Sequence, residues 1–369
     1  MKKLGNWIIF LGAGPFDYDL VISLKNTEFN VCVVDGNKDN KIQYHCDLFL
    51  NFNVLEEKKI YKAILNLLPS NNKVFVYSSS ELSLFTGMFL KSKLNDESFL
   101  GDYKRLFFNK TYCKLEWEKN KILTPRFYEI DYNEIDYSEI KRFELPIIIK
   151  PINGFGGDGV TKLSNRADVD KLKNYIDIHK YSKYILEEYI EGREFNVSGW
   201  FIDGNYFPSY ICEIKTRLNF SADTIIFGCI LTDKEKLFMH LELQNAASIL
   251  NINNGPISGS FIKSNLGNYL LEVAPIYSRF SSHCLLRLIG STPLECYLNH
   301  LIGRDPVDFD FLIKKQKTKY FCSIMEIEKF ENLSNELQTN NTLIDCSYIG
   351  KQAAYSKDVC AVITSEPKE

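Results

Sequence analysis

The chain has 369 residues, of which 45% are hydrophobic and 25% charged, as in an ordinary folded protein with room for two or three domains. The net charge of −3 gives no electrostatic reason to expect nucleic acid or an anionic membrane as a partner. The ten cysteines include no C-x-x-C pair, which argues against a zinc site and favours reduced thiols in a cytoplasmic protein. No apolar run approaches the length of a membrane span.

The first part of the chain alternates predicted strands with predicted helices, a pattern typical of a parallel sheet. The strands are expected at residues 7–11, 31–34 and 73–77. The turn Gly12-Ala13-Gly14 follows the first strand, and Asp35 ends the second. A G-x-G turn with an acid about twenty residues later resembles a nicotinamide-binding turn, although the third glycine is missing. Dinucleotide binding therefore stays open as an alternative at this point.

A glycine-rich stretch, PIIIKPINGFGGDGV, occupies residues 146–160. An apolar, β-branched run predicts a strand that ends at Lys150, and a return strand is expected after the glycines. Glycine lets backbone amides approach a ligand closely, so a glycine-rich loop beside a lysine suits phosphate oxygens. The stretch is not a Walker A loop, because the lysine precedes the glycines. A flexible hairpin without a ligand is the plain alternative.

The second half of the chain also mixes strands and helices. Strands are expected at 184–189, 195–202, 259–262 and 269–273, with a hairpin turn at Asp203-Gly204. Helices are expected at 235–250 and, interrupted near Pro293, within 285–302. Short strand-like pieces follow Tyr320.

Four motifs, taken in this order, resemble the ATP-grasp superfamily. They are Asn109-Lys110 followed by Thr124-Pro125, the glycine-rich hairpin, ILEEYIEGREF and LLEVAP. The resemblance runs from Trp7 to about Gly303. It implies an α/β chain, with an α+β nucleotide domain of the ATP-grasp fold behind an N-terminal Rossmann-like domain. It points to the carboxylate–amine ligases and to the branch of the N5-carboxyaminoimidazole ribonucleotide synthases.

The resemblance also predicts the domain boundaries. We expect a Rossmann-like pre-ATP-grasp domain at 1–105 and a lid subdomain with the phosphate hairpin and adenine hinge at 106–200. A metal-binding and catalytic subdomain is expected at 201–305, and a small C-terminal subdomain at 306–369.

The family pattern assigns residues to ATP. Lysines would bind the phosphates, glycine amides would cover them, the hinge would read the adenine edge, and a carboxylate would accept the ribose hydroxyls. In that order, these residues are Lys110, Lys150, Gly156, Gly157, Gly159, Glu187, Glu188, Ile190 and Glu194. Solvated lysines, and a surface ion pair of Glu194 with Arg193 or with a lysine, are the alternatives.

Glu272 is the predicted Mg²⁺ ligand, because Mg²⁺ prefers carboxylate and phosphate oxygens. Here the chain departs from the family. Ser260 stands where a second acid is usual, Ala274 replaces an asparagine, and Ile276 replaces an arginine. Another acid, such as Glu213, is a possible substitute. Arg279 and Lys215 are the predicted catalytic cations, which would stabilise the spread negative charge of acyl and phosphoryl transfer.

The resemblance implies an ATP-dependent ligase that activates a carboxylate as an acyl phosphate for attack by an amine, with release of ADP and phosphate. Three alternatives remain open: activation of bicarbonate, ATP binding without turnover, and nicotinamide chemistry. The expected cofactors are ATP and Mg²⁺. The expected partners are small-molecule carboxylate and amine substrates, with no nucleic acid and no membrane, and a homodimer is one option for assembly.

Overall fold

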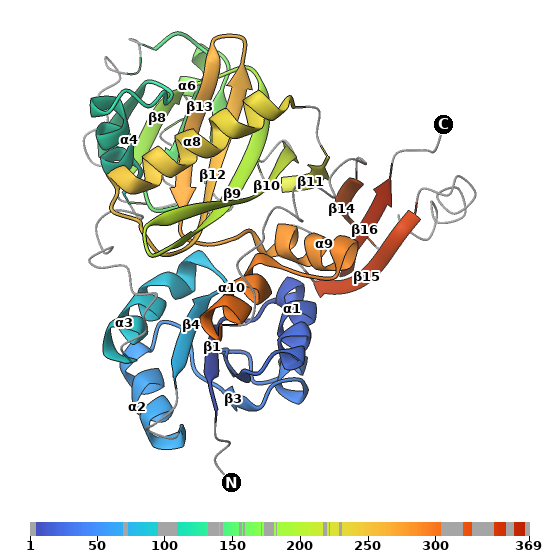
Figure 1. Ribbon diagram of the computed structural model, residues 1–369. Coiled ribbons are helices and arrows are strands. Elements are labelled where there is room, and N and C mark those ends of the chain that lie inside the picture. Colours follow the sequence, from blue (N-terminus) through green and yellow to red (C-terminus); the bar gives the residue numbers. More distant parts are fainter. Residues whose placement is uncertain are drawn as a thin grey trace.

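The computed structural model describes residues 5–68, 73–94, 109–131, 140, 143–154, 157, 159–170, 172, 181, 183–216, 220, 222–228, 231–303, 320–326, 343–351 and 358–365. They form two lobes, with the N-terminal sheet in the lower lobe of Figure 1 and two further sheets in the upper one. None of the helices described is long and apolar enough to cross a membrane.

The lower lobe contains a parallel four-stranded sheet in the order β3-β2-β1-β4. Its central strand β1 is buried at every position, as expected for a parallel strand covered on both faces. The predicted strands and the glycine turn after β1 are therefore confirmed. The elements are β1 (Trp7–Leu11), η1 (Pro15–Asp17), α1 (Tyr18–Ser23), η2 (Leu24–Asn26), β2 (Asn30–Val34), η3 (Lys41–Tyr44), β3 (Leu48–Leu50), α2 (Glu57–Leu67), β4 (Val74–Ser78), η4 (Glu81–Ser83) and α3 (Leu84–Leu94).

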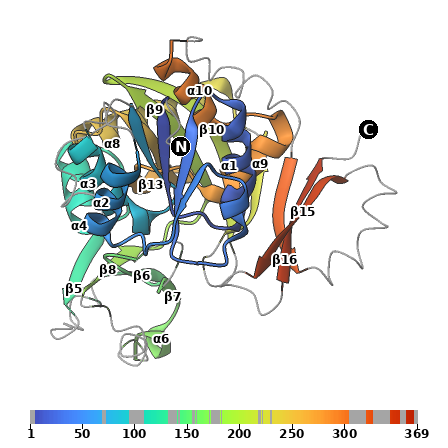
Figure 2. The same ribbon diagram turned by 90° about the horizontal axis from the view of Figure 1, so that it is seen from below.

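A second, antiparallel sheet has the order β5-β8-β6-β7 and carries the glycine-rich hairpin between β6 and β7. Figure 2 shows this sheet, the lid sheet, projecting away from the other two. Helix α4 precedes it and begins after Asn109, whose side chain accepts a hydrogen bond from Tyr112 N. The elements are α4 (Lys110–Lys119), β5 (Phe127–Asp131), β6 (Ile147–Pro151), β7 (Thr161–Leu163), α6 (Arg166–Asp170) and β8 (Lys183–Glu188).

The third sheet has eight strands in the order β13-β12-β9-β10-β11-β14-β16-β15. Helix α8 packs on it with an apolar stripe that includes Met239 and Leu243, and a Thr232–Glu235 capping box fixes the start of this helix. The elements are β9 (Arg193–Ile202), β10 (Asn205–Thr216), β11 (Ala222–Phe227), α8 (Asp233–Ile249), β12 (Gly255–Ser264), β13 (Gly267–Ala274), β14 (Tyr320–Glu326), β15 (Leu343–Lys351) and β16 (Asp358–Ser365).

This sheet crosses two of the boundaries expected from the sequence. Residue 200 lies within β9, and β14, β15 and β16, which follow residue 305, continue the sheet that β9 to β13 begin. Backbone hydrogen bonds between β11 and β14 join the strands that follow residue 305 to the rest of the sheet, because the unpaired edge of a strand can bind a further strand. Figure 2 shows β15 and β16 on the side opposite the lid sheet.

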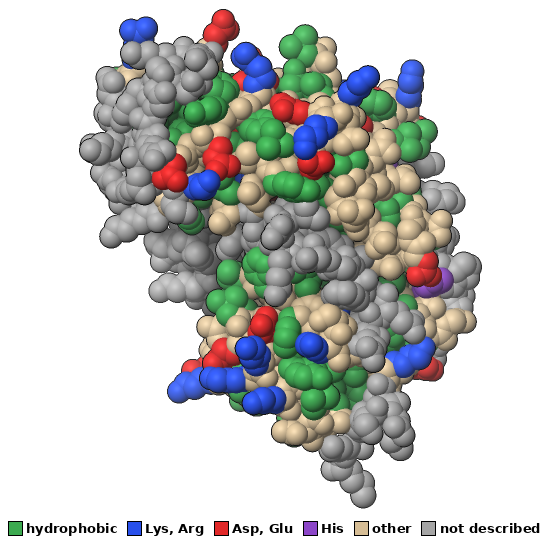
Figure 3. All heavy atoms as spheres, turned by 90° about the vertical axis from the view of Figure 1, so that its left-hand side faces the viewer, with side chains coloured by type: hydrophobic (Ala, Val, Ile, Leu, Met, Phe, Trp, Pro, Cys, Tyr) green, Lys and Arg blue, Asp and Glu red, His purple; other side chains and the backbone are tan. Residues whose placement is uncertain are grey.

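Helices α9 (Arg279–Ile289) and α10 (Pro293–Leu301) lie between the two lobes (Figure 1). One apolar core joins the lobes: Phe10 of β1 belongs to the same buried cluster as Trp200 of β9 and Tyr297 of α10, and the last two rings stack 4.5 Å apart. On the face in Figure 3, acidic and basic side chains are interspersed over the upper lobe. The shared core fixes how the loops of the first sheet approach the upper lobe.

Candidate active site

A cavity of about 370 Å³ lies between the lid sheet and the eight-stranded sheet. Strands β6 and β8 supply one wall, and β9, β10, β12 and β13 supply the other. Most of the predicted site residues line this cavity. From the nucleotide-binding set these are Lys110, Lys150, Gly157, Glu187, Glu188, Ile190 and Glu194, and they are joined by the predicted catalytic Lys215 and the predicted metal ligand Glu272. Gly159 lies in the same hairpin, and Gly156 falls outside the described residues.

The hairpin needs glycine for a definite reason. Gly159 has φ +65°, and a Cβ there would lie 2.7 Å from Pro151 Cγ, too close for any other residue. The Lys110 ammonium of α4 donates to the carbonyl of Gly154 and lies 3.5 Å from that of Ile152. The hairpin and Lys110 are therefore held together at one end of the cavity.

Glu187 lies between two buried lysines. Its Oε2 is 2.8 Å from Lys150 Nζ, and its Oε1 is 3.0 Å from Lys114 Nζ. Burial alone would raise the pKa of Glu187, but the two ammonium groups together lower it. Both carboxylate oxygens are thus engaged with lysines, so the side chain of Glu187 is set to orient Lys150 rather than to lie free beside a base.

Glu194 faces the cavity from β9 and is not part of the ion pair that the sequence left open. Its neighbour Arg193 binds Glu213 of β10 with two nitrogens, the closest approach being 2.5 Å. Burial, and then the charge of Glu272, raise the pKa of Glu194 to about 7, while Lys150 lowers it. Glu213 is therefore paired with Arg193. Ionisation of the buried Glu194 carboxyl group costs free energy, and a hydrogen-bond donor on a ligand would offset that cost.

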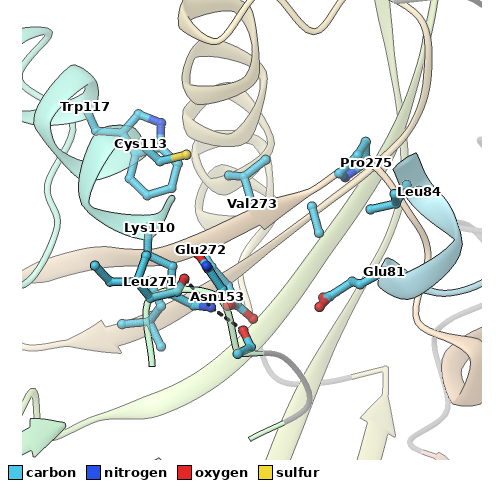
Figure 4. A pocket seen from close by; sticks show the side chains of 13 residues that line it. Glu81, Leu84, Lys110, Cys113, Trp117, Asn153, Leu271, Glu272, Val273 and Pro275 are labelled. Carbon is cyan, nitrogen blue, oxygen red and sulfur yellow. Dashed lines mark hydrogen bonds between the residues drawn. The ribbon is translucent and has the colours of Figure 1, made fainter. Parts of the chain in front are cut away.

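Glu272 of β13 lies directly opposite Ser260 of β12, as the sequence predicts from adjacent strands. Beyond Glu272 a smaller cavity of about 40 Å³ extends toward the first sheet, and Glu81 and Lys110 also line it (Figure 4). Burial and the nearby charge of Glu272 raise the pKa of Glu81 to about 7. Glu81 thus comes from the lower lobe to face the end of the cavity that Glu272 and Lys110 share.

The donor set around Glu272 fits Mg²⁺ only together with oxygens from a ligand. Among the described residues no group of three or more His, Cys, Asp or Glu side chains is gathered closely enough to hold a metal. One carboxylate with a hydroxyl opposite it matches an ion that keeps waters and is shared with phosphates.

Arg279, predicted to act on the substrate, lies elsewhere. Its guanidinium donates to Ser79 O at 2.8 Å and to Gly12 O at 3.2 Å, and its Nε is 3.0 Å from Asp17 Oδ2. Gly14 permits this approach, because a Cβ there would lie 2.9 Å from Arg279 Nη1. Arg279 is not among the residues that line either cavity.

The position of Arg279 also bears on dinucleotide binding. In a sheet of order 3-2-1-4 ligands enter between the carboxyl ends of β1 and β4, and Arg279 occupies that place. The amides of Ala13 and Gly14 are taken by the carboxylates of Asp35 and Asp17. This glycine turn therefore serves internal contacts in place of a pyrophosphate.

Sequence reasoning missed two residues of the site, Lys114 and Glu81. Lys114 follows Lys110 by four residues, and this spacing places both ammonium groups on one face of a helix. Glu81 follows β4, at the carboxyl edge of a parallel sheet where ligands commonly bind. Both signals were present in the sequence, but neither showed which partner the side chain would meet.

Comparison with known proteins gives three findings. Residues 143–286 match the model of the ATP-grasp domain. A stretch of 84 residues is 31% identical to D-alanine–D-alanine ligase of Pelagibacter ubique; it makes up 22% of this chain and spans only 27% of that relative.

Two solved structures match nearly the whole chain. The L-amino acid ligase of Bacillus licheniformis has a TM-score of 0.75 and 14% identity, with 100% of this chain and 95% of that chain covered. The N5-carboxyaminoimidazole synthetase of Staphylococcus aureus complexed with ADP has a TM-score of 0.77 and 15% identity, with the same coverage. Residues 143–286 thus match an ATP-grasp domain, and the chain as a whole shares the fold of these two solved structures.

Proposed function

We propose that this protein is an ATP-dependent ligase that converts a carboxylate into an acyl phosphate, which an amine then attacks. One observation carries the proposal: Lys110, Lys150, Glu194 and Glu272, which come from four separate elements, converge on a single cavity. Two cations, a carboxylate suited to hydroxyl donors and a carboxylate suited to a metal are the set that a magnesium nucleotide requires. The D-alanine–D-alanine ligase and the L-amino acid ligase, which resemble the chain, join carboxylates to amines by name.

The nucleotide would lie along the cavity from the hinge to Glu272. Backbone groups of Glu188 and Ile190 would read the adenine edge, since Glu187 is already held by lysines. Glu194 would accept the ribose hydroxyls, and Lys110 and Lys150 would bind the phosphates with the amides of the hairpin. Lys215, which also lines the cavity, would lie at its far wall on β10 and is our candidate for a catalytic cation.

Glu272 would hold Mg²⁺, with Ser260 opposite leaving space for a water. A bound Mg²⁺ would neutralise the phosphates and polarise the transferred phosphoryl group. Because the chain offers one acid here in place of two, we expect weak binding of the free ion and tighter binding of the ion carried by the nucleotide.

The proposed reaction consists of two displacements. A carboxylate oxygen forms a bond to the γ-phosphorus of ATP and ADP departs; the amine nitrogen then forms a bond to the acyl carbon and phosphate departs, while the amine loses a proton. Glu81 lines the small cavity beside Glu272 and Lys110, where this reaction would take place. Its carboxylate is placed to attract a cationic amine through opposite charge.

Activation of bicarbonate is the second candidate. The whole-chain likeness to the N5-carboxyaminoimidazole synthetase favours it, as does Ala274-Pro275 after Glu272, which resembles that branch of the superfamily. The two candidates differ only in the carboxylate, so one assay separates them.

The test is ADP release from ATP with Mg²⁺, measured with pools of amino acids as carboxylates and amines, and separately with bicarbonate and amines. Wild type should release ADP with one pool and form an amide detectable by mass, whereas Glu272→Gln should not. Stimulation by bicarbonate alone selects the second candidate. If wild type and Glu272→Gln are equally inactive with every pool while both bind ADP, the protein is a nucleotide-binding protein without turnover, and the ligase proposal fails.

A further inference from the structure

Lys114 is a third lysine beneath the phosphate end of the site, and it lines neither cavity. Its side chain is fully buried, with Nζ 3.0 Å from Glu187 Oε1. Burial lowers the pKa of Lys114 to about 8 in spite of the charge of Glu187. A buried ammonium is costly, and its retention here calls for a role that an apolar side chain would not serve.

The charges around Glu187 suggest that role. With Lys150 as its only partner, Glu187 would cancel the charge of the ammonium that faces the cavity. With Lys114 on its other oxygen, the buried group of Lys114, Glu187 and Lys150 carries a net charge of +1. We propose that Lys114 is a positioning residue that neutralises Glu187, so that Lys150 is held in place by Glu187 and yet keeps its charge for an anionic ligand.

A second contact of Lys114 reaches the strand of the metal ligand. Its ammonium donates to Thr124 Oγ1 at 2.6 Å, and Thr124 Oγ1 donates to Leu270 O at 2.8 Å. Leu270 N in turn donates to Leu123 O at 2.8 Å. Leu270 lies two residues before Glu272 in β13, so one buried network connects the hinge strand, helix α4 and the strand that carries Glu272.

The inference rests on the proposed function, because it takes the anionic ligand to be the phosphates of ATP. It predicts that a substitution of Lys114 lowers binding affinity for a charged ligand but not for an uncharged one. Lys114→Met leaves Glu187 paired with Lys150 alone, so the cavity loses a net positive charge although no residue in contact with the nucleotide has changed. We expect ADP to bind about tenfold more weakly or worse, since a charge-assisted contact of this kind contributes roughly 1.4 kcal/mol or more. Adenosine, which has no phosphate, should bind as it does to wild type.

The deciding variant is the double substitution Lys114→Met with Glu187→Gln. It removes one positive and one negative charge and restores the net +1 at Lys150, so ADP affinity should recover to near the wild-type value. Calorimetry with ADP and with adenosine, for wild type and both variants, measures this.

A purely structural role of Lys114 predicts a different pattern of ligand affinities. Both ligands would then weaken together, and the double variant would show no recovery, which overturns the inference. If Lys114→Met fails to fold, the double variant decides alone, because the glutamine amide oxygen can still accept a hydrogen bond from Lys150: ADP affinity far below wild type contradicts the proposal. Failure of the proposed function is distinguishable, because it is read from wild type alone, which would then bind no ADP or would bind ADP without turnover. The inference is decided by the difference in ADP affinity between wild type and the variants.

Discussion

Arg279 of helix α9 and Asp17, at the end of η1, lie 3.0 Å apart and join the upper lobe to the glycine turn of the first sheet. Asp17 is buried, and burial raises its pKa to about 7 even with Arg279 beside it. Arg279 also donates to the backbone oxygens of Gly12 and Ser79. The arginine that the sequence assigned to transition-state stabilisation therefore closes the interface between the loops after β1 and β4.

This arrangement predicts that Arg279→Met lowers stability more than it lowers nucleotide affinity. The variant loses three hydrogen bonds, to Gly12 O, Ser79 O and Ser79 Oγ, and leaves Asp17 without its cation. We therefore expect the free energy of unfolding to fall by about 1–3 kcal/mol at pH 8. Below about pH 6 Asp17 is protonated in both proteins, and the difference should shrink because the charge pair no longer exists. Urea unfolding at pH 5.5 and 8 measures it. Unchanged stability with lost turnover would instead place Arg279 on the substrate.

Glu194→Gln should weaken nucleotide binding and stabilise the free protein. The pKa of Glu194 is raised from the ordinary 4.5 to about 7, so the unfolded chain loses its proton first as pH rises. Glu194 therefore leaves the free energy of unfolding unchanged below pH 4.5 and lowers it progressively between pH 4.5 and 7. Above pH 7 the free energy of unfolding stays reduced, by at most about 3 kcal/mol. Glutamine removes that cost but also the charge-assisted bonds to the ribose, so ADP affinity should fall about tenfold.

Melting temperatures at pH 5 and 8, together with calorimetry of ADP, check both halves of this prediction. Wild type and variant should melt alike at pH 5, and the variant should melt higher at pH 8. A variant that melts lower at both values, with ADP affinity unchanged, would mean that Glu194 is a structural partner.

The sequence predicted those parts of the site that depend on local pattern. The hairpin after Lys150 follows from its glycines, and the opposition of Ser260 and Glu272 follows from two short strands joined by a tight turn. It did not predict the partners of Arg279 or Lys114, because these contacts join residues about 200 and 73 positions apart and depend on how the lobes pack. The assignment of β14 to the eight-stranded sheet was missed for the same reason, since pairing between distant strands leaves no local pattern.

Glu81→Gln should affect the amine substrate. Glu81 lines the small cavity beside Glu272 and Lys110. In the proposed mechanism the amine approaches from this side. Removing its charge should raise the KM for the amine about tenfold, because a hydrogen bond to a charged group contributes roughly 1.5–3 kcal/mol. The KM for ATP should hardly change. Initial rates against each substrate measure this, and a rise in the Mg²⁺ requirement with an unchanged amine KM would assign Glu81 to the metal.

The last prediction concerns the acid that the family places at Ser260. Ser260 is paired directly with Glu272 across β12 and β13, so a carboxylate introduced there would face the same ligand. Ser260→Glu should therefore lower the Mg²⁺ concentration needed for half-maximal ADP release, since two carboxylates hold the ion more tightly than one.

Glu272→Gln should abolish turnover, because glutamine keeps the shape of the side chain and removes its charge, while adenosine binding at the hinge stays intact. The measurement is ADP release against Mg²⁺ concentration for wild type and both variants. Mn²⁺ titration followed by electron paramagnetic resonance with ADP present serves as a reading independent of turnover. Ser260→Glu should bind Mn²⁺ more tightly than wild type and Glu272→Gln less tightly. If Ser260→Glu leaves Mn²⁺ affinity unchanged while Glu272→Gln lowers it, the ion lies on the side of Glu272 that faces Glu81, away from β12.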